Sequence, residues 1–470
     1  MVPERLAPLL DETAPLATRF TAAGWRLYLV GGSVRDAILG ETVAPDLDFT
    51  TDARPDDIEA VVKGWADAIW DQGRRFGTIG VKKDGRVYEI TTHRAEAYTS
   101  DSRKPDVEFS DVVEADLSRR DFTVNAMALS LPDAALIDPF GGLDDLAAYR
   151  LRTPLSPTES FTDDPLRMLR AARFISGYHF LPDPELVDAV KALRSRLEIV
   201  SPERIRAELD KLLVVESPEA GLWFLVNTGL AEEFLPELPA LALQQDPVHH
   251  HKDVLAHTIA VVEKTSRDKI LRLAALLHDI GKPKTRSFGR GGVSFHHHEV
   301  VGARMAEERM RALRYPEDEI ADVRRLVELH LRFHGYGDDV WTDSAVRRYA
   351  TDAGPLLDRL NELTRCDCTT RNQRRAADLA RRMDLLEERI AELREQEELD
   401  RIRPDLDGNQ IMARLGIGPG PDVGRAWRFL YELRLDEGPL GEDEAGRRLD
   451  GWWATRRGAG RGSGPRTAGA

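Results

Sequence analysis

Along the first 150 positions of the chain, short apolar runs alternate with segments in which apolar residues recur at helical spacing. The run LYLV from Leu27 to Val30 predicts a buried strand, and DLDFTT at residues 46–51 predicts a second. Residues 76–94 alternate around Asp84-Gly85, a pattern typical of a hairpin. Helical spacing predicts an amphipathic helix within residues 1–24. It predicts another from Pro55 to Trp70, with Ile58, Val61, Val62, Trp65 and Ile69 on one face.

From Pro157 onward the apolar residues recur at helical spacing almost throughout. Long helices are expected around residues 162–180, 201–214 and 371–400. The fold class is therefore α+β, a mixed sheet with helices followed by an all-α remainder. The predicted domains are a head (1–150), a helical neck and body (151–240), a histidine-rich domain (241–370), a helical tail (371–455) and a disordered Gly-rich end (456–470).

A glycine pair directly follows the first strand. Gly31-Gly32 stops the strand, and we expect a helix to begin at once with Ser33 as N-cap, Asp36 in capping-box spacing and Gly40 as C-cap. Glycines permit close approach of a ligand, and a helix start presents free N–H groups and a positive dipole. A triphosphate would fit there.

Two acids stand on the second strand. Asp46 and Asp48 are two residues apart, so on a strand they share a face and reach one hard cation. Mg²⁺ takes one or two carboxylates and leaves its other positions to water and phosphate. Glu89, on the second hairpin strand, is a candidate third acid. The alternative is a capped turn beside solvated acids.

A cationic segment, RRDFTVNA, begins at Arg119. Arginine binds phosphate bidentately, and Asp or Asn accepts from or donates to ribose hydroxyls. Arg120, Asp121 and Asn125 are therefore candidate nucleotide ligands. The alternative is a helix start with a surface salt bridge.

Asp164 and Arg167 are three apart on the helix expected from Thr162 or Asp163, and so share one face. A carboxylate that accepts from an amino group, beside a guanidinium that donates to a ring nitrogen, matches the pairing edges of C and A. U and G present the opposite pattern, and unpaired buried groups would reject them. An ordinary ion pair is the alternative.

Ten of the twelve histidines lie between residues 245 and 370. An ordered set within this region, with an adjacent His-Asp pair in LAALLHDIGK, is similar to an HD domain, a helical metal-dependent phosphohydrolase. Its candidate ligands are His257, His278, Asp279, His298, His330 and Asp367. Imidazole and carboxylate together favour Mn, Fe, Ni or Zn. The run His249 to His251 is expected to be loop.

Composition narrows the class of protein. The chain has 470 residues, 42% hydrophobic and 31% charged, which is typical of a soluble protein of several domains. A net charge of −15 argues against a protein that coats nucleic acid non-specifically. Cys366 and Cys368 exclude a disulfide framework, and no apolar run approaches a membrane span or signal peptide. We expect a cytoplasmic protein with no membrane contact.

The motifs GGSVRD, DLD, RRDFTVNA, DPFGGLDDL, DDPLRMLRAARF and SPERIRAELDKLL stand in one order over residues 20–240. This order resembles the class II tRNA nucleotidyltransferase and bacterial poly(A) polymerase family. The resemblance implies a polymerase-β-type head in which Asp46 and Asp48 hold Mg²⁺ and Glu89 is the third catalytic acid. The nucleotide-binding residues it implies are Gly31, Gly32, Ser33, Arg35, Arg120, Asp121, Asn125, Asp164, Arg167, Arg170 and Arg173.

The function expected from the resemblance is addition of C, C and A from CTP and ATP to the 3′ end of tRNA. A poly(A) polymerase or an enzyme that adds only A is the close alternative. The polar segment from Ala97 to Ser110, expected to be a mobile loop, argues against an enzyme that adds only CC. A phosphohydrolase with an inactive RNA-binding head is the alternative of another class, and a non-catalytic RNA-binding protein is weaker still. The sequence leaves the oligomeric state open.

Overall fold

The computed structural model describes residues 6–41, 46–97, 106–242, 253–289, 292–336, 341–368, 373–397 and 402–459. The chain divides into two compact units. The first consists of Met1–Ala240 with Ala312–Tyr315, and the second of Leu241–Arg311 with Pro316–Ala470. No helix within the described residues is long and apolar enough to cross a membrane.

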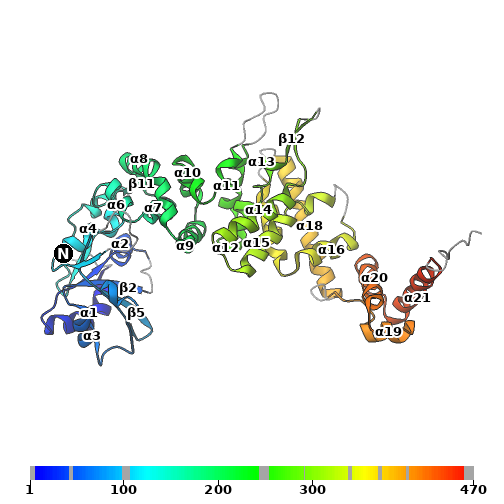
Figure 1. Cartoon of the computed structure of the whole chain (residues 1–470), viewed down its shortest axis with the longest axis horizontal. Helices are drawn as coiled ribbons and strands as arrows, with labels where there is room; N and C mark the ends of the chain where they lie inside the picture. The colour runs from blue at the N-terminus through cyan, green and yellow to red at the C-terminus, as the bar shows by residue number, and fades with distance from the viewer. Residues whose placement is uncertain are drawn as a thin grey trace, which may run out of the picture. The chain divides into compact units, whose positions relative to one another are not determined.

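A seven-stranded sheet organises the first unit, in the order β3-β4-β5-β2-β1-β8-β9. Two of its strands, β2 and β5, are labelled in Figure 1. Its strands are β1 (Leu27–Val30), β2 (Asp46–Thr51), β3 (Ala68–Trp70), β4 (Thr78–Lys83), β5 (Arg86–Thr92), β8 (Ala128–Leu131) and β9 (Leu136–Ile137). β2 and β5 pair in parallel, whereas the other neighbours are antiparallel. The sheet is therefore mixed, and the predicted α+β class is confirmed.

The helices of the first unit are α1 (Ala7–Ala22), α2 (Gly32–Leu39), α3 (Pro55–Val62), α4 (Val113–Ser118), α5 (Gly142–Ala147), α6 (Pro157–Asp163), α7 (Leu166–Tyr178), α8 (Pro184–Leu193), α9 (Pro202–Leu213) and α10 (Glu219–Asn227). The predicted helix from Pro55 to Trp70 is wrong beyond Val62. Gly64 takes a left-handed φ of 74°, and Ile69 then pairs with Val81 on the sheet. Strand pairing here overrides the helical spacing of the apolar residues.

The expected helix start at Thr162 or Asp163 is also wrong. Both residues end α6, whose N-cap Ser156 accepts a hydrogen bond from the Glu159 backbone N–H at 3.2 Å. Asp164 then adopts an extended conformation, because the ring of the following Pro165 disfavours helical geometry in the residue before it. Helix α7 therefore begins only at Leu166.

Two strands also occupy part of the segment expected to be a loop. β6 (Arg94–Ala97) pairs antiparallel with β7 (Asp106–Phe109). Both ends of the Ala97 to Ser110 segment therefore belong to a two-stranded ribbon. Residues 98–105 lie outside the described part of the chain. A further short pair joins β10 (Arg150–Leu151) to β11 (Leu181–Pro182).

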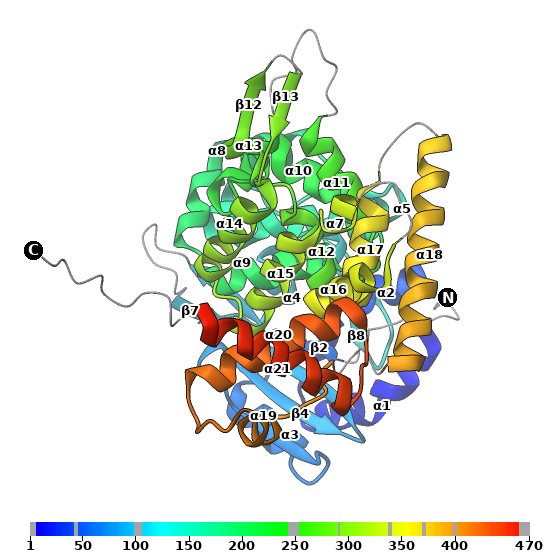
Figure 2. The ribbon, with the colours of Figure 1, turned by 90° about the vertical axis from the view of Figure 1, so that its right-hand side faces the viewer.

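The described part of the second unit is helical except for one hairpin, β12 (Arg286–Gly289) and β13 (Gly292–Phe295), which rises beside α13 (Figure 2). Its helices are α11 (Val254–Lys264), α12 (Lys269–Leu277), α13 (Lys282–Thr285), α14 (His298–Ala312), α15 (Glu317–Leu329), α16 (Asp343–Ala353), α17 (Leu357–Asp367), α18 (Gln373–Glu397), α19 (Gly408–Leu415), α20 (Pro421–Glu437) and α21 (Glu442–Ala459). Along α18 the predicted apolar face buries Met383, Leu386, Ile390 and Leu393.

Candidate active site and metal cluster

The glycine turn joins β1 to α2. Gly31 has φ 73° and precedes the helix as its N-cap, so the predicted cap at Ser33 is wrong: Ser33 lies inside the first turn. A Cβ at Gly31 would lie 2.9 Å from Arg120 Nη1 and 3.7 Å from Asp48 Oδ2. The backbone angle therefore favours glycine, and a larger residue would also have to displace the Arg120 guanidinium. Gly40 ends α2 with φ 77°, as predicted.

Three acids share one face of the sheet. Asp46 and Asp48 are exposed on either side of buried Leu47, and Glu89 is exposed between two buried residues of β5. The parallel register places Asp48 opposite Glu89. Desolvation, together with the neighbouring carboxylates, raises the pKa of Asp48 and Glu89, while Arg120 partly offsets this at Asp48. Such a group of oxygens with like charge is suited to a hard divalent cation.

Arg120 is held beside these acids by a buried aspartate. Its Nη2 lies 3.3 Å from Asp116 Oδ2, and Arg119 Nη2 donates to Asp116 Oδ1 at 2.6 Å. Burial raises the pKa of Asp116, but the two arginines outweigh that effect and lower it to about 2. Asp116 thus stays ionised and fixes Arg120 next to the glycine turn.

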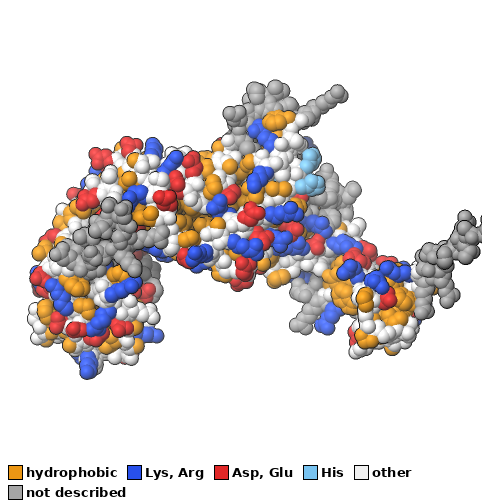
Figure 3. Space-filling view, in the orientation of Figure 1, with side chains coloured by type: hydrophobic (Ala, Val, Ile, Leu, Met, Phe, Trp, Pro, Cys, Tyr) orange, Lys and Arg blue, Asp and Glu red, His pale blue; other side chains and the backbone are white. Residues whose placement is uncertain are grey.

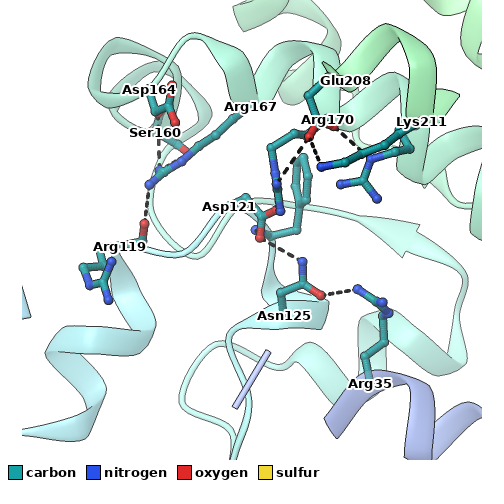
Figure 4. Close-up of polar contacts among 12 residues, drawn as sticks. Arg35, Arg119, Asp121, Asn125, Ser160, Asp164, Arg167, Arg170, Glu208 and Lys211 are labelled. Carbon is teal, nitrogen blue, oxygen red and sulfur yellow. Dashed lines mark hydrogen bonds and ion pairs between the residues drawn. The ribbon is translucent and has the colours of Figure 1, made fainter. Parts of the chain in front are cut away.

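A second network joins Asp121 to three other candidate residues (Figure 4). Asp121 accepts from Arg170 Nε at 2.8 Å and from Asn125 Nδ2 at 2.9 Å, and Asn125 Oδ1 accepts in turn from Arg35. Asp121 is only 8% exposed. Despite its burial, Arg170 and Asn125 hold the pKa of Asp121 well below its usual range. A surface salt bridge is therefore excluded for this motif.

Sequence reasoning missed Glu208. It lies buried on α9, where its Oε2 accepts from Arg173 Nε at 2.9 Å and its Oε1 is 3.8 Å from Arg170 Nη1. Glu208 thereby orders Arg170 and Arg173 on α7. The signal was present: Glu208 is three residues after Ile205 and one before Leu209, on the buried face of α9.

Asp164 and Arg167 do not share a helix face as predicted, because Asp164 precedes α7. Arg167 is buried, and donates to Ser160 Oγ at 2.8 Å and to the Arg119 carbonyl. Asp164 Oδ2 accepts instead from Arg204 at 2.9 Å, while its Oδ1 accepts from the Leu166 backbone N–H. Among the described side chains Asp164 pairs with Arg204 and not with Arg167, so the alternative of an ion pair between Asp164 and Arg167 is wrong as well.

The second unit gathers all six predicted metal ligands into two groups. His257, His278 and Asp367 form one; Asp279, His298 and His330 form the other. Within each group the potential ligand atoms lie within 4.8 Å of one another. The two groups adjoin, because His278 Nε2 is 3.3 Å from Asp279 Oδ2 and 3.5 Å from Asp367 Oδ1. His249 to His251 lie outside the described residues.

The buried histidines are oriented as ligands. His278, His298 and His330 each place Nδ1 within 2.7–2.8 Å of the backbone carbonyl three residues earlier. Their Nε2 atoms are buried without a hydrogen-bond partner among the described residues. A backbone acceptor on Nδ1 orients each ring so that Nε2 is the nitrogen available to a metal, which would take the place of any proton there. The residues present therefore fit a metal centre.

The charges in this cluster also favour a bound metal ion. Burial opposes protonation of His278, yet Asp279 and Asp367 raise its pKa to about 10. Both carboxylates have a pKa well below the usual range despite burial, mainly because of the neighbouring histidines. Two buried anions thus attract positive charge, which a divalent ion also supplies.

The chain matches three protein families in succession. Residues 27–152 match the poly A polymerase head domain, 179–241 match a family described as the probable RNA and SrmB-binding site of polymerase A, and 249–393 match the HD domain. The fold and the two sites thus define a polymerase-type head joined to an HD domain. The resemblance to the class II tRNA nucleotidyltransferase and poly(A) polymerase family is confirmed.

The curated relatives to which the chain is similar include CCA-adding enzymes of two bacteria. The CCA-adding enzyme of Limosilactobacillus reuteri (strain DSM 20016) is 39% identical over 228 residues, 48% of this chain and 55% of that protein. The CCA-adding enzyme of Bacillus subtilis (strain 168) is 37% identical over 273 residues, 57% of this chain and 64% of that protein. The matches thus span about half to two thirds of these curated relatives.

Solved structures share the fold over nearly the whole chain. The Bacillus stearothermophilus CCA-adding enzyme in complex with CTP aligns with 97% of this chain and all of its own, with a TM-score of 0.69 and 22% identity. The Thermotoga maritima CCA-adding enzyme complexed with tRNA aligns with 96% of each chain, with a TM-score of 0.56 and 20% identity.

Proposed function

We propose that the chain is a CCA-adding tRNA nucleotidyltransferase, which adds C, C and A from CTP and ATP to the 3′ end of tRNA without a nucleic-acid template. The observation that carries the proposal is the shared face of Asp46, Asp48 and Glu89 beside the Gly31 turn. The names of the curated relatives support the same activity.

The acids of the head would hold Mg²⁺, whose role when bound is to activate the RNA 3′-hydroxyl for in-line attack on the α-phosphate and to neutralise the leaving pyrophosphate. The start of α2 would receive the triphosphate through its backbone N–H groups. Arg120, ordered by Asp116, lies next to this turn and is suited to bind a phosphate oxygen.

Base selection is assigned to Asp164 and Arg167. The Asp164 carboxylate would accept from the amino group of C or A, while the Arg167 guanidinium donates to the adjacent ring nitrogen. In the free protein Asp164 is bonded to Arg204, and Arg167 to Ser160 and Arg119. Reading a base therefore requires an exchange of these contacts. A network of hydrogen bonds would support the part of the site that holds the base. Its members are Arg35, Asp121, Asn125, Arg170 and Arg173.

The test supplies purified protein and Mg²⁺ with two substrates, a tRNA that ends at the discriminator base and a transcript that ends in CC, each with CTP, ATP or both. Growth by CCA on the first and by a single A on the second is the expected result. Long A tails on any RNA would identify a poly(A) polymerase. Addition of A alone, on the CC end only, would identify an A-adding enzyme.

The HD cluster is proposed as a second metal site, for Mn, Fe, Ni or Zn, with the ligand set His257, His278, Asp279, His298, His330 and Asp367. If the head were inactive, phosphohydrolysis at this cluster would be the remaining activity. Asp46→Asn separates the two: it should abolish incorporation and leave metal binding at the cluster intact. A cytoplasmic location is proposed because a chain with two cysteines has no disulfide framework of the kind found in secreted proteins.

A further inference from the structure

The β12–β13 hairpin interrupts the sequence of the metal cluster. Asp279 and His298, two members of one ligand group, lie on either side of it in the chain. The segment between Asp279 and Glu299 contains no acidic residue but four cations: Lys282, Lys284, Arg286 and Arg290. In a chain with a net charge of −15, this segment is a local positive region attached to the metal cluster.

The two faces of the hairpin differ in character. The register pairs Arg286 with Phe295 and, two residues on, pairs Phe288 with Val293, so these four side chains share a face. The opposite face carries the pair of Ser287 and Ser294, whose hydroxyls are hydrogen-bonded at 2.8 Å. One face is therefore cationic and aromatic, whereas the other is small and polar.

Cations and aromatic rings alternate along the first of these faces. The Arg286 guanidinium carbon lies 4.7 Å from the Phe288 ring centroid, and Lys282 Nζ lies 5.8 Å from that of Phe295. Lys282 Nζ in turn is 2.5 Å from Asp279 Oδ2, in the metal cluster. Figure 3 shows blue and orange side chains on this part of the second unit, with pale-blue histidines nearby. We name Phe288, Arg286, Phe295 and Lys282 the hairpin strip.

Phe288 is 70% exposed, and the Arg286 guanidinium lies beside its ring. An aromatic platform flanked by cations is the arrangement that binds single-stranded nucleic acid, because bases stack on the ring and phosphates pair with the cations. A purely apolar partner would not require the cations, and the lack of acids between Asp279 and Glu299 favours a polyanion.

We propose that the hairpin strip binds the single-stranded 3′ segment of an RNA and leads its terminal phosphodiester toward the HD cluster. RNA is the expected polyanion because residues 179–241, in the first unit of the same chain, match a family described as the probable RNA and SrmB-binding site of polymerase A. The polynucleotide would stack on Phe288, and its phosphates would pass Arg286 toward Lys282. The hairpin strip would thus bind the substrate of the HD cluster. This binding does not depend on the activity of the head.

The test measures binding in EDTA, so that no metal-dependent hydrolysis occurs. A fluorescein-labelled single-stranded RNA of twelve nucleotides is titrated with full-length protein, and its anisotropy is followed. Phe288→Ala and Arg286→Gln should each weaken binding about tenfold. Leu385→Ala and Arg381→Gln are matched controls on α18 in the same unit, since these side chains are also exposed, and they should leave the affinity unchanged.

A second readout locates the RNA. The same oligonucleotide with 4-thiouridine at its 3′ end is photo-cross-linked, and the modified peptides are mapped; cross-links within residues 280–298 are expected. Cross-links confined to residues 27–241, or equal affinity of all four variants and the wild type, would overturn the proposal. So would a wild-type dimer that Phe288→Ala dissociates, because a second copy would then be the partner. Incorporation of C and A by Phe288→Ala reports on the head separately.

Discussion

Asp48 on β2 lies directly opposite Glu89 on β5, in the one parallel pair of the seven-stranded sheet. Parallel register puts both side chains on the same face, and Asp46, two residues before Asp48, joins them there. The three carboxylates repel one another, and this repulsion contributes to the raised pKa of Asp48 and Glu89. The three carboxylates are therefore arranged to bind a cation, and their repulsion lowers the stability of the metal-free protein.

Asp48→Asn should lower nucleotide incorporation about a thousandfold while the melting temperature stays level or rises. Activity falls because a ligand of Mg²⁺ is lost. Stability is kept because the substitution removes a charge from a crowded anionic group. Single-turnover incorporation and thermal melting check the two expectations. Asp56→Asn, an exposed acid of the same unit, is the control. A parallel loss of activity and melting temperature in Asp48→Asn would instead indicate a structural role.

Arg170→Gln should destabilise the first unit by about 3–5 kcal/mol, because it leaves buried Asp121 without its cation. Arg204→Gln removes an exposed ion pair with Asp164 and should cost less than about 1 kcal/mol. Denaturant unfolding of both variants measures the difference. Equal, small losses would show that Asn125 and water satisfy Asp121 without Arg170.

Local pattern was enough to predict the elements that carry the head site. The apolar run before Gly31 and the alternation through Asp46 and Asp48 each place a strand where the structure has one. Pattern failed where distant partners or proline decide. Ile69 joins a strand because Val81 is available to pair with it, and Pro165 delays α7 by disfavouring helix at Asp164.

The candidate residues were likewise found from type and order, but their contacts were not. The bond between Arg35 and Asn125 joins residues 90 positions apart, and the bond between Arg170 and Asp121 spans 49. Such pairs depend on tertiary packing, which no local spacing encodes. The carbonyls that orient His278 and His330 lie only three residues earlier in the chain, but the grouping of ligands from separate helices depends on tertiary packing.

Removal of metal should lower the stability of the second unit. If the HD cluster binds a divalent ion, the ion stabilises the folded state by mass action, about 2.7 kcal/mol at one hundred times its dissociation constant. Protein treated with EDTA and dialysed should melt lower, and Mn²⁺, Ni²⁺ or Zn²⁺ should restore the melting temperature. Metal content by mass spectrometry identifies the ion.

The matched variant for this experiment is His330→Asn, which removes one ligand of the cluster. It should abolish the response to added metal, whereas Asp46→Asn in the head should keep it. A shift of equal size in His330→Asn and the wild type would show that the ions act elsewhere in the protein.

Stability of the first unit should fall as the pH drops below neutrality, because of His93. This side chain is fully buried and its Nδ1 lies 2.7 Å from Thr50 Oγ1. Burial lowers its pKa from 6.5 to about 4, although Asp116 partly opposes the shift. The folded protein therefore disfavours the proton that the unfolded chain accepts, so stability is complete above pH 6.5 and is lost as the pH falls toward 4.

Between pH 7.5 and pH 5 the contribution of His93 amounts to about 2 kcal/mol. Urea unfolding of the wild type and of His93→Asn at both pH values measures it. The variant should be less stable at pH 7.5, because it loses buried ring contacts, but its stability should change less with pH. Equal pH dependence of the two proteins would mean that His93 is reached by water and titrates near its usual pKa.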